Sequence, residues 1–359
     1  MPDWELISRP YLVLSVLVTT LLVSCSNNDG YQNNDGYQMI GVVLSVHDLE
    51  TVDWPKLAAE SGINTIGTHV FPNQVRDFIK SDKGQKFLTD CKKYGIDVEH
   101  QLHSMTDLLP RELFAEDSTM FRMNIEGLRI ADFNCCVHSE KALDIITNNA
   151  VEIAKTLVPT NHRYYFWCDD NAAGCECSEC AEYSESEQAL IIENHIIKAL
   201  RARIDSKAKL AHLAYQGTLK APVKIVPEDG IFLEFAPVYR NWTVSLADRD
   251  AVCTGNLDMT NGQNLDYLAE NLKVFDATEA VILEYWLDVS LQNAYTKPAK
   301  KVVWDKNVFS KDIDIYANYG IRNITTFAVY MDDAYFKAYH DTTSLKEYAK
   351  ILSEYCPPK

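Results

Sequence analysis

Short apolar runs alternate with helix-like segments along the chain from residue 39 onward. The runs have the length and the content of branched and aromatic residues that are typical of buried strands, whereas the segments between them repeat apolar residues at helical spacing. One such segment starts at Ser184, which forms a capping box with Glu187 and so marks a helix N-terminus. The pattern predicts eight strands, at residues 40–47, 63–69, 96–102, 164–169, 209–215, 231–236, 280–286 and 324–330.

Three of the predicted helices end in the same way, with a glycine that is followed directly by isoleucine. These glycines are Gly62, Gly95 and Gly320. Glycine adopts the left-handed conformation that closes a helix, and the isoleucine then opens a buried strand. Alternating strands and helices form parallel α/β sheets. Because eight strand–helix units in about 320 residues suit a closed barrel, the sequence predicts a single (β/α)8 TIM barrel over residues 39–359.

The main alternative is an eight-stranded doubly wound sheet. Sheets of that kind that bind nucleotides carry a glycine-rich loop after the first strand, where the phosphates lie against a helix N-terminus. Here the first strand leads into Ser45-Val46-His47-Asp48, which contains no glycine. The barrel therefore remains the expected fold.

The first 38 residues differ in composition from the rest of the chain. Residues 11–23 form an apolar run that is too short to span a bilayer and has the length of a signal-peptide core. The run leads to Leu22-Val23-Ser24-Cys25, which resembles the lipobox of bacterial lipoproteins, and a polar tandem repeat follows at residues 27–38. We expect a signal peptide at 1–24, an acylated Cys25, and a flexible tether at 25–38. The alternative is a buried N-terminal strand.

The charge of the chain restricts its partners. Its formal net charge is −17, and it contains no run of three or more consecutive basic residues. Nucleic acids and anionic membranes are bound through clusters of lysine and arginine, so both are excluded as direct partners. With the lipobox, this predicts a protein in the envelope of a Gram-negative bacterium that meets the membrane through its lipid anchor only. Its 19 tyrosines and six tryptophans provide rings that stack on sugars or fill a core.

Acidic, histidine and aromatic residues gather at the carboxyl ends of the predicted strands. In TIM barrels the active site forms at that end. The sequence therefore predicts one site, with catalytic carboxylates and a ring of substrate-binding residues. The carboxylates are Asp169, Asp170, Glu234 and Glu284, and the expected substrate-binding residues are His47, His69, His103, Tyr215, Trp286, Tyr330 and Asp332.

Paired carboxyl groups are the machinery of glycoside hydrolysis, in which one group must be protonated. Asp169 and Asp170 are adjacent, and because two close carboxylates repel each other when both are ionised, one of them retains its proton. The pair resembles that of family-84-type β-N-acetylhexosaminidases, which implies that Asp170 is the general acid and that Asp169 orients the substrate. The alternative is a wider pair, formed by one of these aspartates with Glu234 or Glu284.

Two other functions remain open at this point. His47, His69 and His103 would be the ligands of a metal-dependent hydrolase. However, ligands on one strand usually lie two residues apart, whereas His100 and His103 are three apart and point to opposite faces. A catalytically inactive barrel that binds glycans would keep the aromatic rim but would not need the acids.

Cys175, Cys177 and Cys180 form a C-x-C-x-x-C motif directly after the two aspartates. Thiolates at this spacing can share one tetrahedral zinc ion, with a fourth ligand from Cys135, Cys136, His138 or Cys168. The alternative is disulfide bonds, which form outside the cytoplasm. Without Cys25 nine cysteines remain, and an odd number cannot pair completely. The motif therefore favours a structural zinc ion, and no organic cofactor is expected.

The motifs together resemble those of the domain-of-unknown-function 4838 family, a group of barrel domains related to glycoside hydrolases. The resemblance is strongest at Trp167-Cys168-Asp169-Asp170 and Cys175-Glu176-Cys177-Ser178-Glu179-Cys180, and it extends to His212-Leu213-Ala214-Tyr215, Leu233-Glu234-Phe235 and Leu283-Glu284-Tyr285-Trp286. The segment Asn134-Cys135-Cys136-Val137-His138 resembles an upstream part of the family with one cysteine, which implies Cys136 as the fourth metal ligand. The resemblance implies a glycan or oligosaccharide substrate and an enzyme similar to N-acetylhexosaminidases or uronidases.

Overall fold

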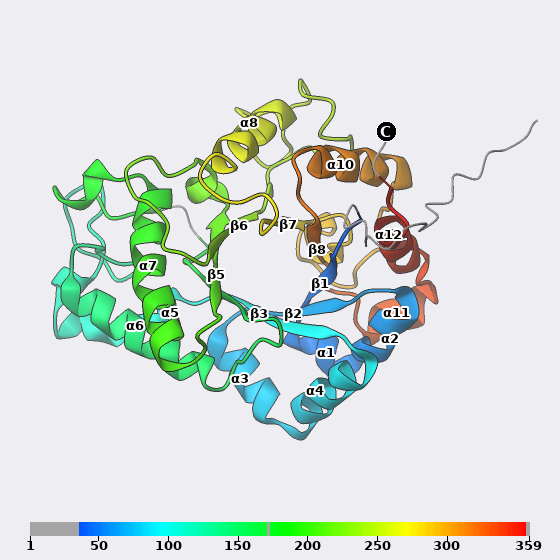
Figure 1. Ribbon diagram of the computed structural model, residues 1–359, viewed down its shortest axis with the longest axis horizontal. Coiled ribbons are helices and arrows are strands. Elements are labelled where there is room, and N and C mark those ends of the chain that lie inside the picture. Colours follow the sequence, from blue (N-terminus) through cyan, green and yellow to red (C-terminus); the bar gives the residue numbers. More distant parts are fainter. Residues whose placement is uncertain (1–35, 171–172, 357–359) are drawn as a thin grey trace, which may run out of the picture. The chain divides into compact units, whose positions relative to one another are not determined.

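Eight parallel strands form a closed barrel in chain order, which confirms the predicted TIM barrel. The computed structural model describes residues 36–170 and 173–356. Because β1 pairs with β2 on one side and with β8 on the other, the sheet closes, and a doubly wound sheet is excluded. Figure 1 shows the strands surrounded by helices. The strands are β1 (Met39–Ser45), β2 (Thr65–His69), β3 (Asp97–His103), β4 (Arg163–Trp167), β5 (Lys209–Ala214), β6 (Ile231–Phe235), β7 (Val281–Glu284) and β8 (Asn323–Phe327).

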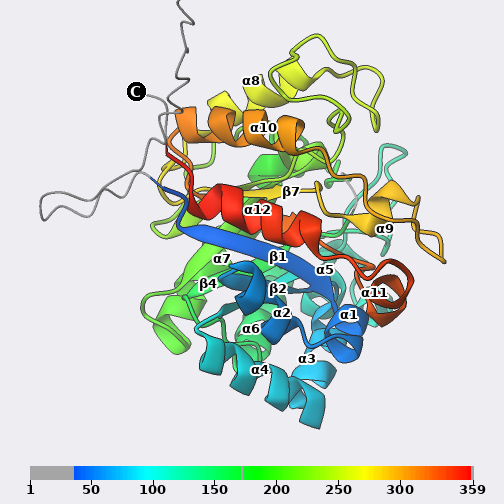
Figure 2. The same ribbon diagram turned by 90° about the vertical axis from the view of Figure 1, so that its right-hand side faces the viewer.

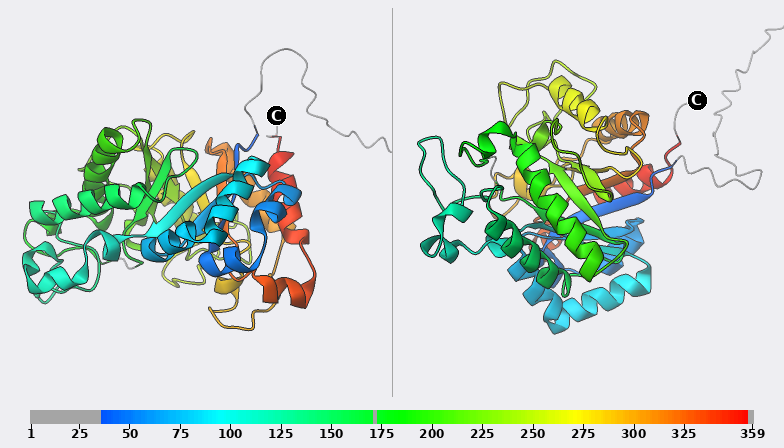
Figure 3. Two further views of the ribbon diagram at one scale, coloured as in Figure 1. Left: turned by 90° about the horizontal axis from the view of Figure 1, so that it is seen from below. Right: turned by 60° about the vertical axis from the view of Figure 1, so that its left-hand side comes forward.

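Helices follow the strands and pack on the outside of the barrel. Figure 3 shows α6 and α7 side by side, and the two helices are in extensive contact. Within the part of the chain that the structure describes, no helix combines the length and the apolar character that a membrane crossing requires. The helices are α1 (Val46–Thr51), α2 (Trp54–Ser61), α3 (Pro72–Lys80), α4 (Asp82–Tyr94), α5 (Met105–Leu108), α6 (Glu140–Ala154), α7 (Glu185–Arg203), α8 (Asn261–Asn271), α9 (Val289–Gln292), α10 (Lys306–Asn318), α11 (Asp333–Tyr339) and α12 (Thr343–Ser353).

The helix boundaries agree with the capping signals in the sequence. Gly62 and Gly95 end α2 and α4 in the left-handed conformation, with φ angles of 88° and 69°. Ser184 accepts a hydrogen bond from the backbone N–H of Glu187, whose side chain reaches back to the N-cap, so the predicted capping box is present at the start of α7.

Strand alternation divides the apolar side chains into two clusters. One cluster fills the interior of the barrel and includes Val43, Trp167, Phe232 and Leu283, whereas a larger one lies between the strands and the helices. Successive side chains of a strand point to opposite faces. The residue number at each strand end therefore decides whether a side chain enters the barrel mouth or the helix layer.

Most of the strands end earlier than the sequence pattern predicts. β1 stops at Ser45, whose hydroxyl caps α1, so His47 lies in that helix. β4 stops at Trp167, which places Asp169 and Asp170 in the loop that follows. Long segments follow the strands at this end, at residues 104–139, 236–260 and 285–305. Figure 2 shows α9 and α11 on the side toward which β1 runs, the face where barrel active sites form.

Candidate active site

A cavity of about 310 Å³ opens at the carboxyl ends of the strands. Its walls come from the ends of all eight strands and from the segments that follow them. The residues that line it are Ser45, His69, Val70, His103, Trp167, Asp170, Leu213, Tyr215, Ala236, Val238, Leu283, Tyr285, Asp288, Ser290, Tyr295, Phe327, Val329 and Tyr330. Five predicted site residues are therefore brought together here: His69, His103, Asp170, Tyr215 and Tyr330.

Aromatic rings pack closely in the deep part of this cavity. The ring centroid of His69 lies 5.7 Å from that of Trp167 and 5.1 Å from that of Phe327, and the rings of His103 and Trp167 are 5.1 Å apart. Trp167 is 2% exposed. Rings that are fixed in this way offer flat apolar faces to a ligand without a large loss of side-chain entropy.

Both cavity histidines are held by backbone carbonyl groups. The Nδ1–H group of His69 donates to the carbonyl oxygen of Gln101 at 2.8 Å, and that of His103 donates to the carbonyl oxygen of Cys168 at 2.8 Å. Burial, with a smaller contribution from His103, lowers the pKa of His69 to about 3. His69 is therefore neutral at physiological pH, and its Nε2 atom is a hydrogen-bond acceptor.

Asp170 lies on the wall of the cavity after β4. Its carboxylate accepts a hydrogen bond from the hydroxyl group of Tyr215 at 2.8 Å and a longer one from the amide of Gln216 at 3.4 Å. The side chain is exposed. This geometry orients the carboxyl group and leaves it accessible to a ligand.

Asp169 does not line this cavity, and it faces the segment that follows β3 instead. Its carboxylate forms an ion pair with Arg111 and accepts a hydrogen bond from the backbone N–H of Asn134 at 2.7 Å. The backbone N–H of Asp169 donates in turn to Oδ1 of Asn134 at 3.0 Å. Asp169 thus fastens the β4 loop to the β3 loop, and of the two adjacent aspartates only Asp170 lines the cavity.

Asp288 is a cavity carboxylate that the sequence reasoning missed. Its Oδ1 atom accepts hydrogen bonds from the hydroxyl group of Ser290 at 2.6 Å and from the backbone N–H of Leu291 at 3.0 Å, which also caps α9. Burial raises the pKa of this carboxyl group above its ordinary value. A signal was present in the sequence, because an Asp directly before a helix at a strand's carboxyl end is a barrel-rim position.

Glu284 and Trp286, both predicted as site residues, point away from the cavity. Leu283 and Tyr285 face the barrel interior, so alternation turns Glu284 and Trp286 toward the helix layer. Glu284 bonds to Arg240 at 2.7 Å and to the hydroxyl group of Tyr316 at 2.6 Å. The side chains of Glu284 and Arg240 are each about 1% exposed. This carboxylate therefore serves a buried ion-pair network.

Glu234 lies inside the barrel beneath the ring of Trp167. Its Oε2 atom accepts a hydrogen bond from the indole N–H of Trp167 at 2.7 Å, while Oε1 is buried and bonds to none of the described residues. Burial raises the pKa of Glu234 well above its ordinary value, and the neighbouring Glu99 adds to this effect. Glu234 therefore supports the aromatic floor and does not reach the cavity itself.

The remaining predicted residues lie at the rim. Tyr330 lines the cavity. Its backbone has a positive φ angle of 72°, and the backbone of Tyr295, which also lines the cavity, has a φ angle of 56°. Such strained conformations of non-glycine residues cluster at functional sites. Asp332, in contrast, caps α11 and pairs with Lys297, and His47 is largely exposed with its Nε2 atom 3.4 Å from Asp332. Neither Asp332 nor His47 lines the cavity.

A serine–histidine–glutamate chain lies apart from this cavity, between α7 and β5. The hydroxyl group of Ser186 lies 3.0 Å from Nε2 of His212, and Nδ1 of His212 lies 2.7 Å from Glu193. The three side chains are at most 5% exposed. A substrate cannot reach such a chain, so it joins the helix to the strand as buried polar contacts.

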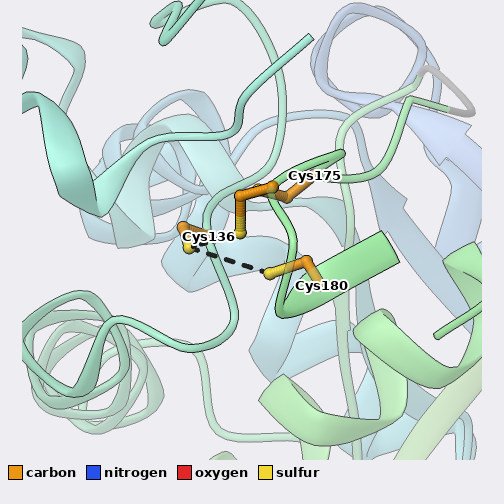
Figure 4. Close-up of side chains that lie close together, drawn as sticks. Cys136, Cys175 and Cys180 are labelled. Carbon is orange, nitrogen blue, oxygen red and sulfur yellow. Dashed lines mark hydrogen bonds between the residues drawn. The ribbon is translucent and has the colours of Figure 1, made fainter. Parts of the chain in front are cut away.

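The cysteine motif closes into a compact four-sulfur group. The ligand atoms of Cys136, Cys175, Cys177 and Cys180 all lie within 4.8 Å of one another, and all four side chains are buried. Cys136 Sγ is 3.8 Å from Cys177 Sγ and 3.7 Å from Cys180 Sγ. Sulfurs at the corners of a tetrahedron around a zinc ion would be about 3.8 Å apart, given Zn–S bonds of about 2.3 Å. Figure 4 shows three of these cysteines converging from two separate segments.

The four cysteines are free thiols, so the disulfide alternative does not hold for them. Donors surround the group, as metal-bound thiolates require: the backbone N–H of Met123 lies 3.3 Å from Cys175 Sγ, and Arg129 lies 3.7 Å from the same atom. His138 contacts Cys180 Sγ at 3.3 Å from outside the group. The residues present therefore fit a metal ion.

No other group of three or more Cys, His, Asp or Glu side chains in the described ranges brings its ligand atoms close enough to share an ion. The three histidines of the metal-hydrolase alternative are therefore not gathered, because His47 lies outside the cavity that His69 and His103 line.

Comparison with solved structures supports the fold. A tri-modular GH5 (subfamily 4) endo-beta-1,4-glucanase from Bacillus licheniformis, solved with cellotetraose, is similar with a TM-score of 0.51 and 10% identity, over 90% of this chain and 60% of that one. PbGH5A from Prevotella bryantii B14, solved with a xyloglucan tetradecasaccharide, also has a TM-score of 0.51 and 10% identity, over 89% of this chain and 96% of that one. At such identities the likeness shows the barrel fold alone.

No curated protein matches this chain. A family model does match, over residues 69–352, and it is described as Domain of unknown function (DUF4838). The match runs from the end of β2 into α12. It includes the cysteine group and both aspartates that line the cavity. The resemblance found in the sequence motifs is therefore confirmed, and the chain belongs to the DUF4838 family.

Proposed function

We propose that this protein is a glycoside hydrolase in which Asp170 and Asp288 are the two catalytic carboxyl groups. The observation that carries the proposal is that both line one aromatic cavity at the carboxyl face of the barrel, from the ends of β4 and β7. Glycoside hydrolysis requires two carboxyl groups that flank the scissile bond. This pair replaces the adjacent pair that the sequence predicts.

The environments of the two groups suggest a division of roles. Asp170 is exposed at the cavity wall, where a departing sugar can receive its proton, and the hydroxyl group of Tyr215 fixes its orientation. Asp288 is buried, which raises its pKa, while the hydrogen bonds from Ser290 and Leu291 to its Oδ1 atom stabilise the ionised form and fix its orientation. In our proposal Asp170 is the general acid, and Asp288 attacks the anomeric carbon or activates a water molecule.

The cavity is suited to a neutral glycan. Among the described residues that line it, two are aspartates and none is lysine or arginine. Recognition of an anionic sugar depends on such basic side chains. Similar barrels have been solved with cellotetraose and a xyloglucan oligosaccharide, which supports a neutral substrate without identifying it. We therefore favour neutral hexosides or N-acetylhexosaminides over the uronides that the sequence left open.

A panel of aryl glycosides tests this function. We expect hydrolysis of at least one neutral hexoside or N-acetylhexosaminide and none of the uronides. Because burial raises the pKa of Asp288, its carboxylate is lost at a higher pH than that of an ordinary aspartate. The acid limb of kcat/KM should accordingly lie at a higher pH than an ordinary aspartate would give.

The variant Ser290→Ala provides the sharper test of Asp288. It removes the hydrogen bond of 2.6 Å that stabilises the ionised form, so the acid limb should move upward by about 0.5–1 pH unit while kcat at neutral pH changes little. An unmoved acid limb, or hydrolysis of uronides only, would contradict the assignment.

We also propose that the cysteine group binds one structural zinc ion. Cys136 comes from the loop after β3, and the other three cysteines come from the loop after β4. All four are protein ligands, which is typical of closed structural sites, whereas catalytic zinc keeps a position for water. The ion would tie the two loops together next to Asp170.

We propose that the protein is a lipoprotein of the bacterial envelope. Cys25 and the segment before it lie outside the described residues, so the proposal rests on the lipobox-like sequence. Mass spectrometry of the membrane fraction is expected to find a diacylated peptide that begins at Cys25. Recovery of a protein whose unmodified Cys25 follows an intact residue 24 would contradict this.

A further inference from the structure

A second pocket, of about 110 Å³, lies outside the proposed catalytic cavity. Three of the six tryptophans of the chain line it: Trp242, Trp286 and Trp304. Trp242 and Trp304 are partly exposed, whereas Trp286 is buried at the base. Trp286, which the sequence analysis predicted to bind substrate in the catalytic cavity, belongs to this second pocket instead.

The pocket shares the carboxyl face with the catalytic cavity. Trp242 belongs to the segment after β6, and Trp304 to the segment between β7 and α10. The short helix α9 lies between the two sites, because Ser290 lines the cavity and Gln292 lines the tryptophan pocket. An extended ligand that leaves the cavity across α9 would therefore meet this pocket.

The rings at the base are held rigidly. The ring centroids of Trp286 and Trp304 lie 4.8 and 5.0 Å from that of Phe309, on the helix α10. The indole N–H of Trp286 donates to Asp312 at 3.1 Å, and that of Trp304 donates to Glu347 at 2.7 Å. Rings that are fixed before binding lose little entropy when a ligand arrives.

The loop that carries Trp242 is also fixed. The neighbouring Arg240 is 1% exposed and bonds to Glu284 and Asp312, at 2.7 Å each. The backbone N–H of Asn241 donates to Asn261 at 2.8 Å. The buried network that contains Glu284 thus supports this pocket from below, which gives that glutamate a structural role distinct from catalysis.

Polar groups accompany the rings at the opening. The indole N–H of Trp242 bonds to none of the described residues, and Asp305 is an exposed carboxylate whose Oδ1 atom caps α10. A sugar ring presents apolar C–H faces and hydroxyl groups, so it matches stacked indoles beside a free donor and an acceptor. The carboxylate and the net charge of −17 disfavour an anionic ligand.

We infer that the tryptophan pocket is an auxiliary binding site for a neutral glycan, which holds a part of the polymer that lies outside the catalytic cavity. The inference rests on the proposed function only in taking the ligand to be a glycan. It predicts that Trp242 contributes to the binding of polymers and not to the hydrolysis of small glycosides.

The test uses the full chain with Asp170→Asn, which is expected to slow turnover, and a panel of immobilised neutral polysaccharides as the probe. Adding Trp242→Ala should weaken retention on the best-bound polysaccharide about 3- to 10-fold, and Trp242→Phe should restore part of it. Tyr94→Ala is the matched control, since Tyr94 is a partly exposed ring at the opposite end of the barrel, before β3.

Activity separates this site from the catalytic one. In the otherwise unchanged chain, Trp242→Ala should leave kcat/KM for an aryl glycoside within about 2-fold of its original value. Equal retention with and without Trp242, or no retention of any polysaccharide by the Asp170→Asn chain, would overturn the inference. A change in oligomeric state without a change in retention would overturn it as well, because the pocket would then be a protein interface. Failure of the proposed function would appear separately, as absence of aryl glycoside hydrolysis.

Discussion

Replacement of Asp170 by asparagine is expected to lower kcat by roughly 10²–10⁴-fold, the usual contribution of a general acid. The substitution keeps the size of the side chain and an acceptor for the hydroxyl group of Tyr215, which is 2.8 Å away. It removes the proton that the departing sugar oxygen must receive. Glycosides with good leaving groups need less protonation, so their turnover should fall least. Steady-state kinetics on aryl glycosides with graded leaving groups measure this dependence.

Two further carboxylate variants serve as controls for Asp170. Glu284→Gln alters a buried carboxylate in the helix layer, so stability should fall while the activity of the folded fraction persists. Asp169→Asn weakens the contact with Arg111 and should show no dependence on the leaving group. If Asp170→Asn keeps full turnover while Glu284→Gln abolishes it in folded protein, the proposed assignment is wrong.

Among the substitutions proposed for this protein, replacement of one cysteine of the four-sulfur group is expected to lower the stability most. Structural zinc contributes apparent binding free energies of about 10–16 kcal/mol in small zinc domains, and part of this supports the fold. We expect about one zinc ion per chain in the purified protein. Cys180→Ser should release the metal and lower the denaturant concentration at which the protein unfolds, as should prolonged chelation. Elemental analysis and denaturant unfolding measure the two effects.

Cys253→Ser is the matched control for this experiment. Cys253 is also a buried free thiol, and it accepts a hydrogen bond from Asn264 at 3.3 Å that a serine hydroxyl group can accept. It lies outside the four-sulfur group, so metal content should not change. A metal-free native protein with unchanged stability, or equal effects of both substitutions, would contradict the structural zinc ion.

The barrel could be predicted from the sequence because its signals are local and repeat. Each strand is a short apolar run. The Gly-Ile pairs that begin at Gly62 and Gly95 mark both the end of a helix and the approach to the next strand. Repetition of one unit eight times then limits the topology to a closed parallel barrel or an open sheet. The four-cysteine group was predicted for a similar reason, since three of its members lie within six residues of one another.

Of the two carboxylates that we propose as catalytic, the sequence predicted only Asp170, and the reason is the alternation of side chains. A shift of one residue at a strand end moves a side chain from the barrel mouth to the helix layer. Glu284 and Trp286 are separated from Leu283 and Tyr285 by one position, yet the former pair packs against α10 and the latter lines the cavity. Composition and spacing do not fix where the strand ends, so they could not decide between the two faces.

The role of Asp169 could not be predicted because its partners are distant in the sequence. Arg111 and Asn134 lie 58 and 35 residues away, in a segment without regular periodicity. From the sequence, Asp169 looks as suitable for catalysis as the adjacent Asp170 until its ion pair with Arg111 is known. Only the folded position of the β3 loop shows that its carboxylate is already bonded to that loop.

The four-sulfur group has a consequence for how this barrel can acquire new substrates. It brings the loop after β3 against the loop after β4, which also carries Asp170. Residues 285–305, which supply Tyr285, Asp288 and Tyr295 to the other side of the cavity, have no such crosslink. Under the proposed function, mutations that adapt the protein to another sugar should therefore accumulate in residues 289–305, beyond Asp288. A library for directed evolution is best built there, with the sulfur-bound loops left unchanged.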